Sequence, residues 1–378
     1  MPWKVDPVTE QRLALIHAVR TAGLPVAEAA RRFGVSRKTA FKWLARHDAD
    51  PDGPPADRSR RPATSPGRTA PDVEAVVLQA RDRWGWGPRK LHAVLARSGG
   101  PAPPARTVAA ILRRHGRLAV RPPAPADAPP PQRFERPAPN DLWQLDYKGP
   151  IEVERRRVAP LAVLDDHSRY CLALRPCPDM TYATTQAALW DLFGDVGLPV
   201  ALLCDNAFSA RNTPVGLSAF DAWLIRLGVE PIHGRAYHPQ TQGKVERFNG
   251  TLQRELWPTA RRDLLSHFTA DLDRWRPTYN AVRPHEALGD EPPCCRWRES
   301  PRRRPPSVPE VSYPADAEVR TVGQAGDISW HRARVLVGAG LAGERVRVVE
   351  ADAGLEVYYG PYRVRSIAGA LLVPHRRV

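Results

Sequence analysis

The stretch Leu142-Trp-Gln-Leu-Asp-Tyr-Lys148 alternates apolar and polar residues, and this alternation predicts a half-buried strand. Two further strands are expected at residues 157–165 and 170–174, and the short connections between the three predict an antiparallel meander. After the meander, helices are expected at 182–193, 217–227 and 243–256, and strands at 199–204 and 230–233. This order predicts an α/β core in which helices pack against a mixed sheet.

Three acidic residues stand in this core at positions that solvation alone does not explain. Asp146 interrupts the first strand, Asp205 ends an apolar strand, and Glu246 lies on the last helix, whose apolar stripe is formed by Val245, Phe248, Leu252 and Leu256. A buried carboxylate is costly unless a partner compensates it, and oxygen ligands suit Mg²⁺ or Mn²⁺. Two such ions can activate a water or hydroxyl and stabilise the leaving oxygen. The alternative is that these acids cap helices or pair with arginines.

Four segments of the chain resemble the signature segments of the integrase core. They are WQLDY (143–147), LCDNAF (203–208), HPQTQGKVERFN (238–249) and YNAVRPHEAL (279–288). That core is shared by retroviral integrases and bacterial insertion-sequence transposases, and the chain is most similar to the transposases with helix-turn-helix front ends. The resemblance implies an RNase H-like catalytic core over residues 140–300. It also implies that Asp146, Asp205 and Glu246 are the catalytic residues and hold two Mg²⁺ or Mn²⁺ ions per active site.

The resemblance further implies a mobile loop beside the site at residues 238–243. Gln240 in this loop and Lys244 just after it are expected near the DNA. Asp205 and Glu246 are separated by 40 residues, a few more than the commonest spacing in the family. An insertion is therefore expected at residues 207–215.

The front of the chain predicts a helix-turn-helix DNA-binding domain over residues 1–50. Helices are expected at 8–19 and 26–33, and Ser36 offers an N-cap for a third helix through His47. The residues expected to face DNA there are Ser36, Arg37, Lys38, Thr39 and Lys42. Those expected to pack inward are Ala40, Phe41 and Leu44. The alternative is a plain three-helix bundle with a basic face.

Two proline-rich linkers, at 51–71 and 122–139, flank a second helical block. The first linker carries the expected DNA-contacting arginines Arg58, Arg60, Arg61 and Arg68, and the second has eight prolines in 18 residues, a density that favours extended spacers. Residues 72–121 predict a second, winged helix-turn-helix domain, with Arg89 and Lys90 as candidate DNA contacts. Trp84 and Trp86 in this block are interpreted as core aromatics in preference to base-stacking groups.

Charge is concentrated at the front of the chain. The formal net charge is +15 and the sequence pI is about 10.1. Residues 1–121 hold 23 Lys+Arg against 10 Asp+Glu, whereas the remainder holds 33 against 31. DNA is therefore the expected partner, bound mainly by the first third. The five cysteines have no zinc-type spacing, and the chain has neither a signal peptide nor a membrane-length apolar run, so a cytoplasmic, nucleoid-associated protein with reduced thiols is expected.

Residues 310–378 predict a small all-β domain, because five short alternating segments are separated by glycine-containing turns. Their number suggests an SH3-like barrel. In the integrase-core family that this chain resembles, such a barrel touches DNA or a neighbouring subunit. The alternative is a domain that stabilises the fold without contacting nucleic acid.

Together these observations favour a DNA transposase that binds element ends and catalyses metal-dependent 3′-end cleavage and strand transfer. Its expected partners are double-stranded DNA, as terminal repeats and target, and further copies of itself, and an ATP-dependent accessory protein is a further candidate. A catalytically inactive DNA-binding regulator is the alternative, which the three intact acids disfavour. A nuclease acting on RNA in hybrids is disfavoured because two helix-turn-helix blocks suit B-form DNA better than an A-form helix.

Overall fold

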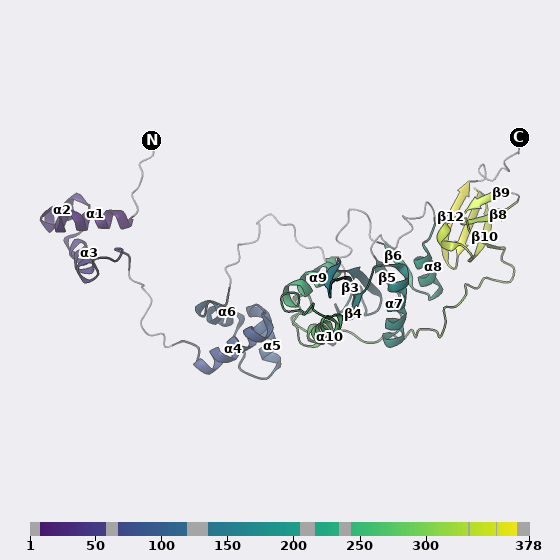
Figure 1. Ribbon diagram of the computed structural model, residues 1–378, viewed down its shortest axis with the longest axis horizontal. Coiled ribbons are helices and arrows are strands. Elements are labelled where there is room, and N and C mark those ends of the chain that lie inside the picture. The colour runs from purple at the N-terminus through teal and green to yellow at the C-terminus, as the bar shows by residue number, and fades with distance from the viewer. Residues whose placement is uncertain are drawn as a thin grey trace. The chain divides into compact units, whose positions relative to one another are not determined.

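The computed structural model describes residues 8–57, 67–118, 135–204, 216–233, 243–331, 333–352 and 354–368 (Figure 1). The chain divides into two compact units, Met1–Arg68 and Thr69–Val378. Among the described helices, none has the length and apolar character needed to cross a membrane. Asp205, Gln240 and the linker arginines Arg58, Arg60 and Arg61 lie outside the described residues.

The first unit contains three helices, α1 (Val8–Arg20), α2 (Val26–Arg32) and α3 (Arg37–Ala49). The expected N-cap is confirmed, because the Ser36 side chain accepts a hydrogen bond from the Thr39 backbone N–H at 3.1 Å. The expectation that Phe41 packs inward is wrong, since this side chain is 53% exposed. Trp43 packs inward in its place, because the 3.6-residue helical period puts positions 40, 43 and 44 on one face.

The second helical block opens the second unit with α4 (Pro71–Trp84), α5 (Pro88–Arg97) and α6 (Ala105–Arg114). Gly85 ends α4 in the left-handed region, with a φ of 67°, which is why glycine stands there. Trp86 is buried in the cluster that the three helices form, and it stacks on Trp84. Residues 67–118 contain no strand, so the expected wing is not found within them.

A six-stranded mixed sheet forms the centre of the second unit. Its strands are β1 (Leu142–Tyr147), β2 (Ile151–Val153), β3 (Arg156–Asp165), β4 (Cys171–Cys177), β5 (Ala201–Cys204) and β6 (Glu230–His233). The order is β2-β3-β1-β5-β6, and β4 pairs with β3. β1, β3 and β4 form the expected antiparallel meander, whereas β1, β5 and β6 run parallel.

Helices cover both faces of this sheet. They are α7 (Tyr182–Val196), α8 (Ala219–Arg226), α9 (Gly243–Glu255) and α10 (Leu265–Ala281). Along β3, Leu161 and Val163 join the cluster under α7 and α8, whereas Ala162 and Leu164 join the cluster under α9 and α10. Helix α10 and strand β2 were not expected from the sequence.

The all-β character of the end of the chain is confirmed. A four-stranded antiparallel sheet in the order β12-β11-β10-β7 accompanies a two-stranded hairpin, β8 with β9. The strands are β7 (Val319–Thr321), β8 (Asp327–Trp330), β9 (Ala333–Leu336), β10 (Arg345–Ala351), β11 (Gly354–Tyr359) and β12 (Tyr362–Ala368). The hydrogen-bonded pairings among the described strands leave the two sheets separate, so a closed barrel is not seen.

Helix α8 is shared between the catalytic sheet and the β domain. Phe220, Trp223 and Leu224 belong to the hydrophobic cluster under the sheet. Ala222 and Ile225, on the other side of the same helix, belong to the cluster of the β domain. The β domain is therefore packed onto the core through one common helix.

Candidate active site

Asp146 lies on the central strand β1, on the face that is covered by α9. The neighbouring residues Trp143 and Leu145 belong to the cluster on the opposite face, and alternation along the strand therefore turns Gln144 and Asp146 toward α9. β5 runs parallel to β1, with Leu203 opposite Gln144. The described part of β5 ends at Cys204, which directly precedes Asp205 in the chain.

Glu246 is exposed on the first turn of α9. The expected apolar stripe of this helix is confirmed, because Val245, Phe248, Leu252 and Leu256 are all buried in the cluster beneath it. Asn249, one turn after Glu246, donates its side-chain amide to Asp146 Oδ2 at 2.6 Å. Asn249 is thus the residue of α9 that contacts Asp146, and Glu246 lies one helical turn before it on the same helix.

Asn249 was missed in the sequence reasoning. It is only 5% exposed, and its Oδ1 atom is buried without a hydrogen-bond partner among the described residues. The available signal was its spacing, because a polar residue directly after Phe248 falls inside the apolar stripe of α9. A buried amide there needs a polar partner, and Asp146 provides one.

The start of α9 is tied to the sheet by two more polar contacts. The Gln144 side chain accepts from the Val245 backbone N–H at 3.3 Å and donates to Asp166 Oδ1 at 2.7 Å. Lys244 Nζ lies 2.5 Å from the same Asp166 oxygen. Burial lowers the pKa of Lys244. Lys244, expected near the DNA, is thus engaged with the turn after β3.

A second buried acid, Asp165, shapes that turn. Its carboxylate accepts from the Asn140 backbone N–H at 2.7 Å and from the Ser168 backbone N–H at 2.7 Å. Burial raises the pKa of Asp165. Because both oxygens of Asp165 accept hydrogen bonds from backbone N–H groups, Asp165 is a structural carboxylate that fixes the path of the chain beside β1.

The donor chemistry of the described part of the site fits a hard divalent cation. Asp146 and Glu246 supply carboxylate oxygens, and the buried Oδ1 of Asn249 lies without a partner in the described part of the chain. Oxygen donors of this kind are those that Mg²⁺ and Mn²⁺ prefer. Within the described ranges, which stop short of Asp205, no group of three or more His, Cys, Asp or Glu side chains comes together.

The candidate DNA contacts of the first unit lie on or beside α3. Arg37, Lys38 and Lys42 are exposed, and Lys42 Nζ lies 4.7 Å from the centre of the Trp43 ring. Ser36 is also exposed, and its hydroxyl lies 2.9 Å from the Thr39 hydroxyl. Arg37, Lys38 and Lys42 thus lie on the outer face of α3.

The candidate DNA contacts of the second helical block lie against the core. Arg89 Nε donates to Asp290 Oδ2 at 2.7 Å, and its Nη1 donates to Glu286 Oε1 at 2.7 Å. Lys90 is partly buried, and burial together with the neighbouring Arg283 lowers its pKa to about 8. The two adjacent cations therefore have different surroundings.

Comparison with known families follows the same division of the chain. A family model described as an integrase core domain matches residues 136–239, and a second model of the same description matches residues 227–293. A homeodomain-like domain model matches residues 6–55, which include α1, α2 and α3. The central sheet and its helices are thus the integrase core, and the front end is a helix-turn-helix domain.

Two curated relatives come from bacterial insertion elements. The chain is 30% identical over 229 residues to the insertion element IS407 uncharacterized 31.7 kDa protein of Burkholderia multivorans, which covers 58% of this chain and 79% of the relative. It is 29% identical over 247 residues to the insertion element IS476 uncharacterized 39.2 kDa protein of Xanthomonas euvesicatoria, covering 61% and 66%.

A solved structure, of a simian T-cell lymphotropic virus intasome in complex with PP2A regulatory subunit B56 gamma, is 16% identical. The similarity covers 77% of this chain and 99% of that one, with a TM-score of 0.37, a value too low to add to the assignment. The family assignment rests on the sequence matches to the insertion-element proteins and to the integrase-core models. The chain belongs to the integrase-core family of insertion-sequence transposases.

Proposed function

We propose that this protein binds the ends of its element and catalyses metal-dependent 3′-end cleavage and strand transfer into target DNA. One observation carries the proposal: Asp146 on the central strand is hydrogen-bonded by Asn249, one helical turn after Glu246. β5, which runs parallel to β1, leads directly to Asp205. This arrangement supports a common site for the three carboxylates.

In the proposed mechanism Asp146, Asp205 and Glu246 hold two Mg²⁺ or Mn²⁺ ions. When bound, the ions would supply activation of the attacking water or 3′-hydroxyl and stabilisation of the leaving oxygen. Asn249 fixes one oxygen of Asp146 by a hydrogen bond to a charged acceptor. Glu246 is exposed on α9, and it is proposed to face the bound DNA. The protein's own residues therefore position carboxylates, and no covalent protein intermediate is required.

Recognition of the element ends is proposed to rest on the first unit. Its helix-turn-helix fold supports base contacts from α3 through Arg37, Lys38 and Lys42. The linker arginines, with Gln240 beside the site, are proposed to contact the DNA backbone, whereas Lys244, also expected there, is held by Asp166. Two DNA ends have to be brought together for joining, and we propose a homo-oligomer for this task.

The β domain is proposed to be an SH3-like domain that touches DNA or a neighbouring subunit. What supports this is its all-antiparallel topology and its position directly against α8 of the core. A domain held in this way can keep bound target DNA or a second subunit at a set distance from β1.

The test is an oligonucleotide assay with a labelled duplex that carries an element end and its flanking DNA. The full chain with Mg²⁺ should nick at the end and join it to a second duplex. Asp146→Asn, Asp205→Asn and Glu246→Gln should each abolish both steps and leave the gel-shift affinity within about twofold, since their role is to hold metal. Retained nicking by any one variant would remove that residue from the site. Binding without any nicking by the unaltered chain would identify a DNA-binding regulator.

A further inference from the structure

Phe41 is a large aromatic side chain that the fold of the first unit leaves in solvent. It is 53% exposed, whereas Ala40, Trp43 and Leu44 of the same helix are buried. It belongs to neither of the two hydrophobic clusters described in this unit. A single exposed apolar residue is common on protein surfaces, so its surroundings decide whether it has a role.

The surroundings of Phe41 are cationic. The exposed residues on this outer face of α3 are Arg37, Lys38, Phe41, Lys42 and Ala45. They share the face because residues three and four apart on a helix are neighbours. Residues 37–47 contain no Asp or Glu. A second copy of the chain placed face to face here would bring like charges together, so the face favours an anionic partner that also offers an apolar group.

Double-stranded DNA offers this combination in its major groove. There the C5 methyl group of thymine is the apolar feature of the base edges, and Phe and Ala side chains are among those that contact it. α3 is the third helix of a unit that matches a homeodomain-like domain, and the third helix of a homeodomain lies in the major groove. Phe41, with Ala45 one turn later, therefore lies on the face that would meet base edges.

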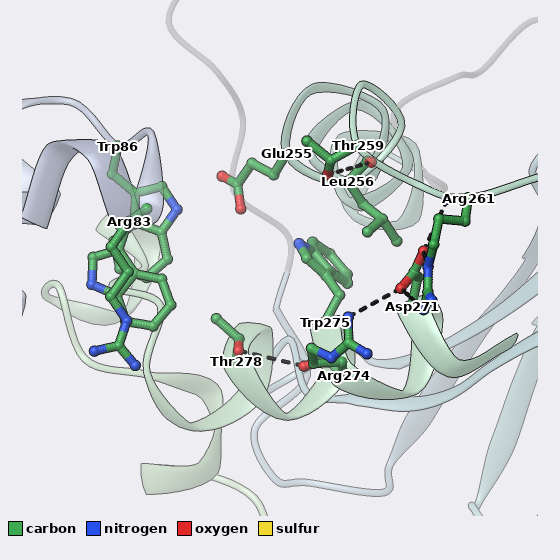
Figure 2. A pocket seen from close by; sticks show the side chains of 11 residues that line it. Arg83, Trp86, Glu255, Leu256, Thr259, Arg261, Asp271, Arg274, Trp275 and Thr278 are labelled. Carbon is green, nitrogen blue, oxygen red and sulfur yellow. Dashed lines mark hydrogen bonds and ion pairs between the residues drawn. The ribbon is translucent and has the colours of Figure 1, made fainter. Parts of the chain in front are cut away.

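The second helical block offers no equivalent side chain within its described residues, 67–118. Its Phe, Trp and Tyr residues there are Trp84 and Trp86 alone, and Trp86 is 4% exposed with Trp84 stacked on it. Both line a pocket of about 390 Å³ that Trp275 of α10 also lines (Figure 2). These rings are engaged inside the second unit. Among the described residues of the two helical blocks, Phe41 is thus the exposed aromatic side chain.

We propose that Phe41 reads the C5 methyl group of one or two thymines in the element end. The inference rests on the proposed function, in which α3 recognises that DNA. Arg37, Lys38 and Lys42 supply charge and hydrogen bonds, and Phe41 adds a contact that distinguishes thymine from cytosine, which has no methyl group at this edge. Phe41 is therefore a specificity-determining residue and contributes little to binding of random DNA.

The test measures binding alone, with the full chain in EDTA to remove the metal ions that cleavage is proposed to need. The probe is an element-end duplex in which each thymine in turn is replaced by deoxyuridine, which lacks the C5 methyl group and keeps the base pair. Fluorescence anisotropy should show binding weakened about fourfold at one or two positions, the factor expected for one buried methyl group. Phe41→Ala should bind the unmodified end about tenfold more weakly and should not distinguish thymine from deoxyuridine at those positions.

Two further variants separate the contact from general effects on the unit. Phe41→Leu keeps an apolar side chain and should retain part of the deoxyuridine effect. Leu13→Ala removes a 46% exposed apolar side chain from α1 and should leave the profile unchanged. Thermal unfolding checks that each variant folds.

A flat deoxyuridine profile for the unaltered chain, or the same profile in Phe41→Ala, would overturn the inference. Loss of self-association in Phe41→Ala with an unchanged profile would instead assign Phe41 to a contact between copies. A chain that prefers the element end to a random duplex but shows a flat profile fails the inference alone. A chain without that preference fails the proposed recognition by α3 as well.

Discussion

Asn249 donates its side-chain amide to the Asp146 carboxylate at 2.6 Å from a position one helical turn after Glu246. This hydrogen bond joins α9 to the central strand at Asp146, one helical turn beyond the contact of the Val245 backbone N–H with Gln144. We expect Asn249→Ala to lower the rate of strand nicking by about 10- to 100-fold, because groups that orient metal ligands commonly contribute that much. The dependence on Mg²⁺ concentration should shift upward while the gel-shift affinity for DNA stays unchanged. Gln253→Ala, on the exposed side of the same helix, is the control and should behave as the unaltered chain does.

Ion identity should separate assembly from chemistry. We expect Mg²⁺ or Mn²⁺ to support nicking and joining, and Ca²⁺ to support binding of the element end without cleavage. Ca²⁺ takes more ligands at longer distances, so it does not reproduce the geometry that the proposed carboxylates set for the smaller ions. Nicking is measured on one DNA substrate with each chloride salt in turn. Undiminished nicking in EDTA would be incompatible with the proposed site.

Recognition of the DNA sequence at the element ends should depend on α3. Replacing Arg37, Lys38 and Lys42 with Ala should weaken binding to the element end more than binding to a random duplex, because a recognition helix contacts bases as well as phosphates. Replacing the linker arginines Arg58, Arg60, Arg61 and Arg68 should weaken both duplexes equally and lower the salt slope by about 0.9 per lost contact. Competition binding at several salt concentrations measures both effects. Equal losses on both duplexes for the α3 variant would show that α3 does not read bases.

His285 should make the second unit sensitive to acid. Burial, together with Arg283, Lys90 and Arg169, lowers its pKa from 6.5 to about 3. The folded protein therefore binds fewer protons than the unfolded chain between these values, and stability falls as the pH drops from about 6.5 toward 3. This group contributes at most about 1.4 kcal/mol of unfolding free energy per pH unit.

The measurement is the melting temperature between pH 7 and pH 4. His285→Gln, which stays neutral throughout, should show a shallower decline than the unaltered chain. His331→Gln, which replaces an exposed histidine of the β domain, should decline as the unaltered chain does. Identical slopes for His285→Gln and the unaltered chain would contradict the assignment.

The sequence predicts the sheet well where burial alternates and poorly where turns are unusual. β1 follows from the alternation of apolar and polar residues, and β3 and β5 follow from runs of apolar residues, whereas β2 is only three residues long. The hairpin from β2 to β3 turns through Glu154 and Arg155, with φ of 52° and 58°. Turns with two positive φ angles normally contain Asn-Gly or Asp-Gly. The Glu154-Arg155 pair is not of this kind, so the local sequence does not predict this turn.

Helix α10 was not predicted from the sequence for a related reason. Pro277 lies inside it, and proline in a helical interior ordinarily argues for a break. Phe268 and Leu272 are nevertheless fully buried in the cluster beneath the sheet, and this packing favours the helix. Tertiary contacts of that kind are not readable from propensity.

The same limit applies to the site. Asp146 and Glu246 could be singled out because acids at buried or patterned positions need an explanation. The role of Asn249 becomes visible only once α9 lies across β1. Arg89, expected to contact DNA, pairs with residues 197 and 201 positions away, a separation that no local pattern encodes.

Helix α8 packs against both the catalytic sheet and the β domain. This shared packing limits how this gene can exchange domains with its relatives by recombination. A recombination junction placed in the proline-rich segment at residues 301–309 would transfer the β domain but leave behind the helix that fills its core. A newly acquired C-terminal domain would then have to pack against Ala222 and Ile225 of α8, whose side chains fit the core of the original β domain. Inheritance of the β domain should therefore be accompanied by compensating changes in the codons for α8, so that the middle and the 3′ end of the coding sequence evolve as a linked pair.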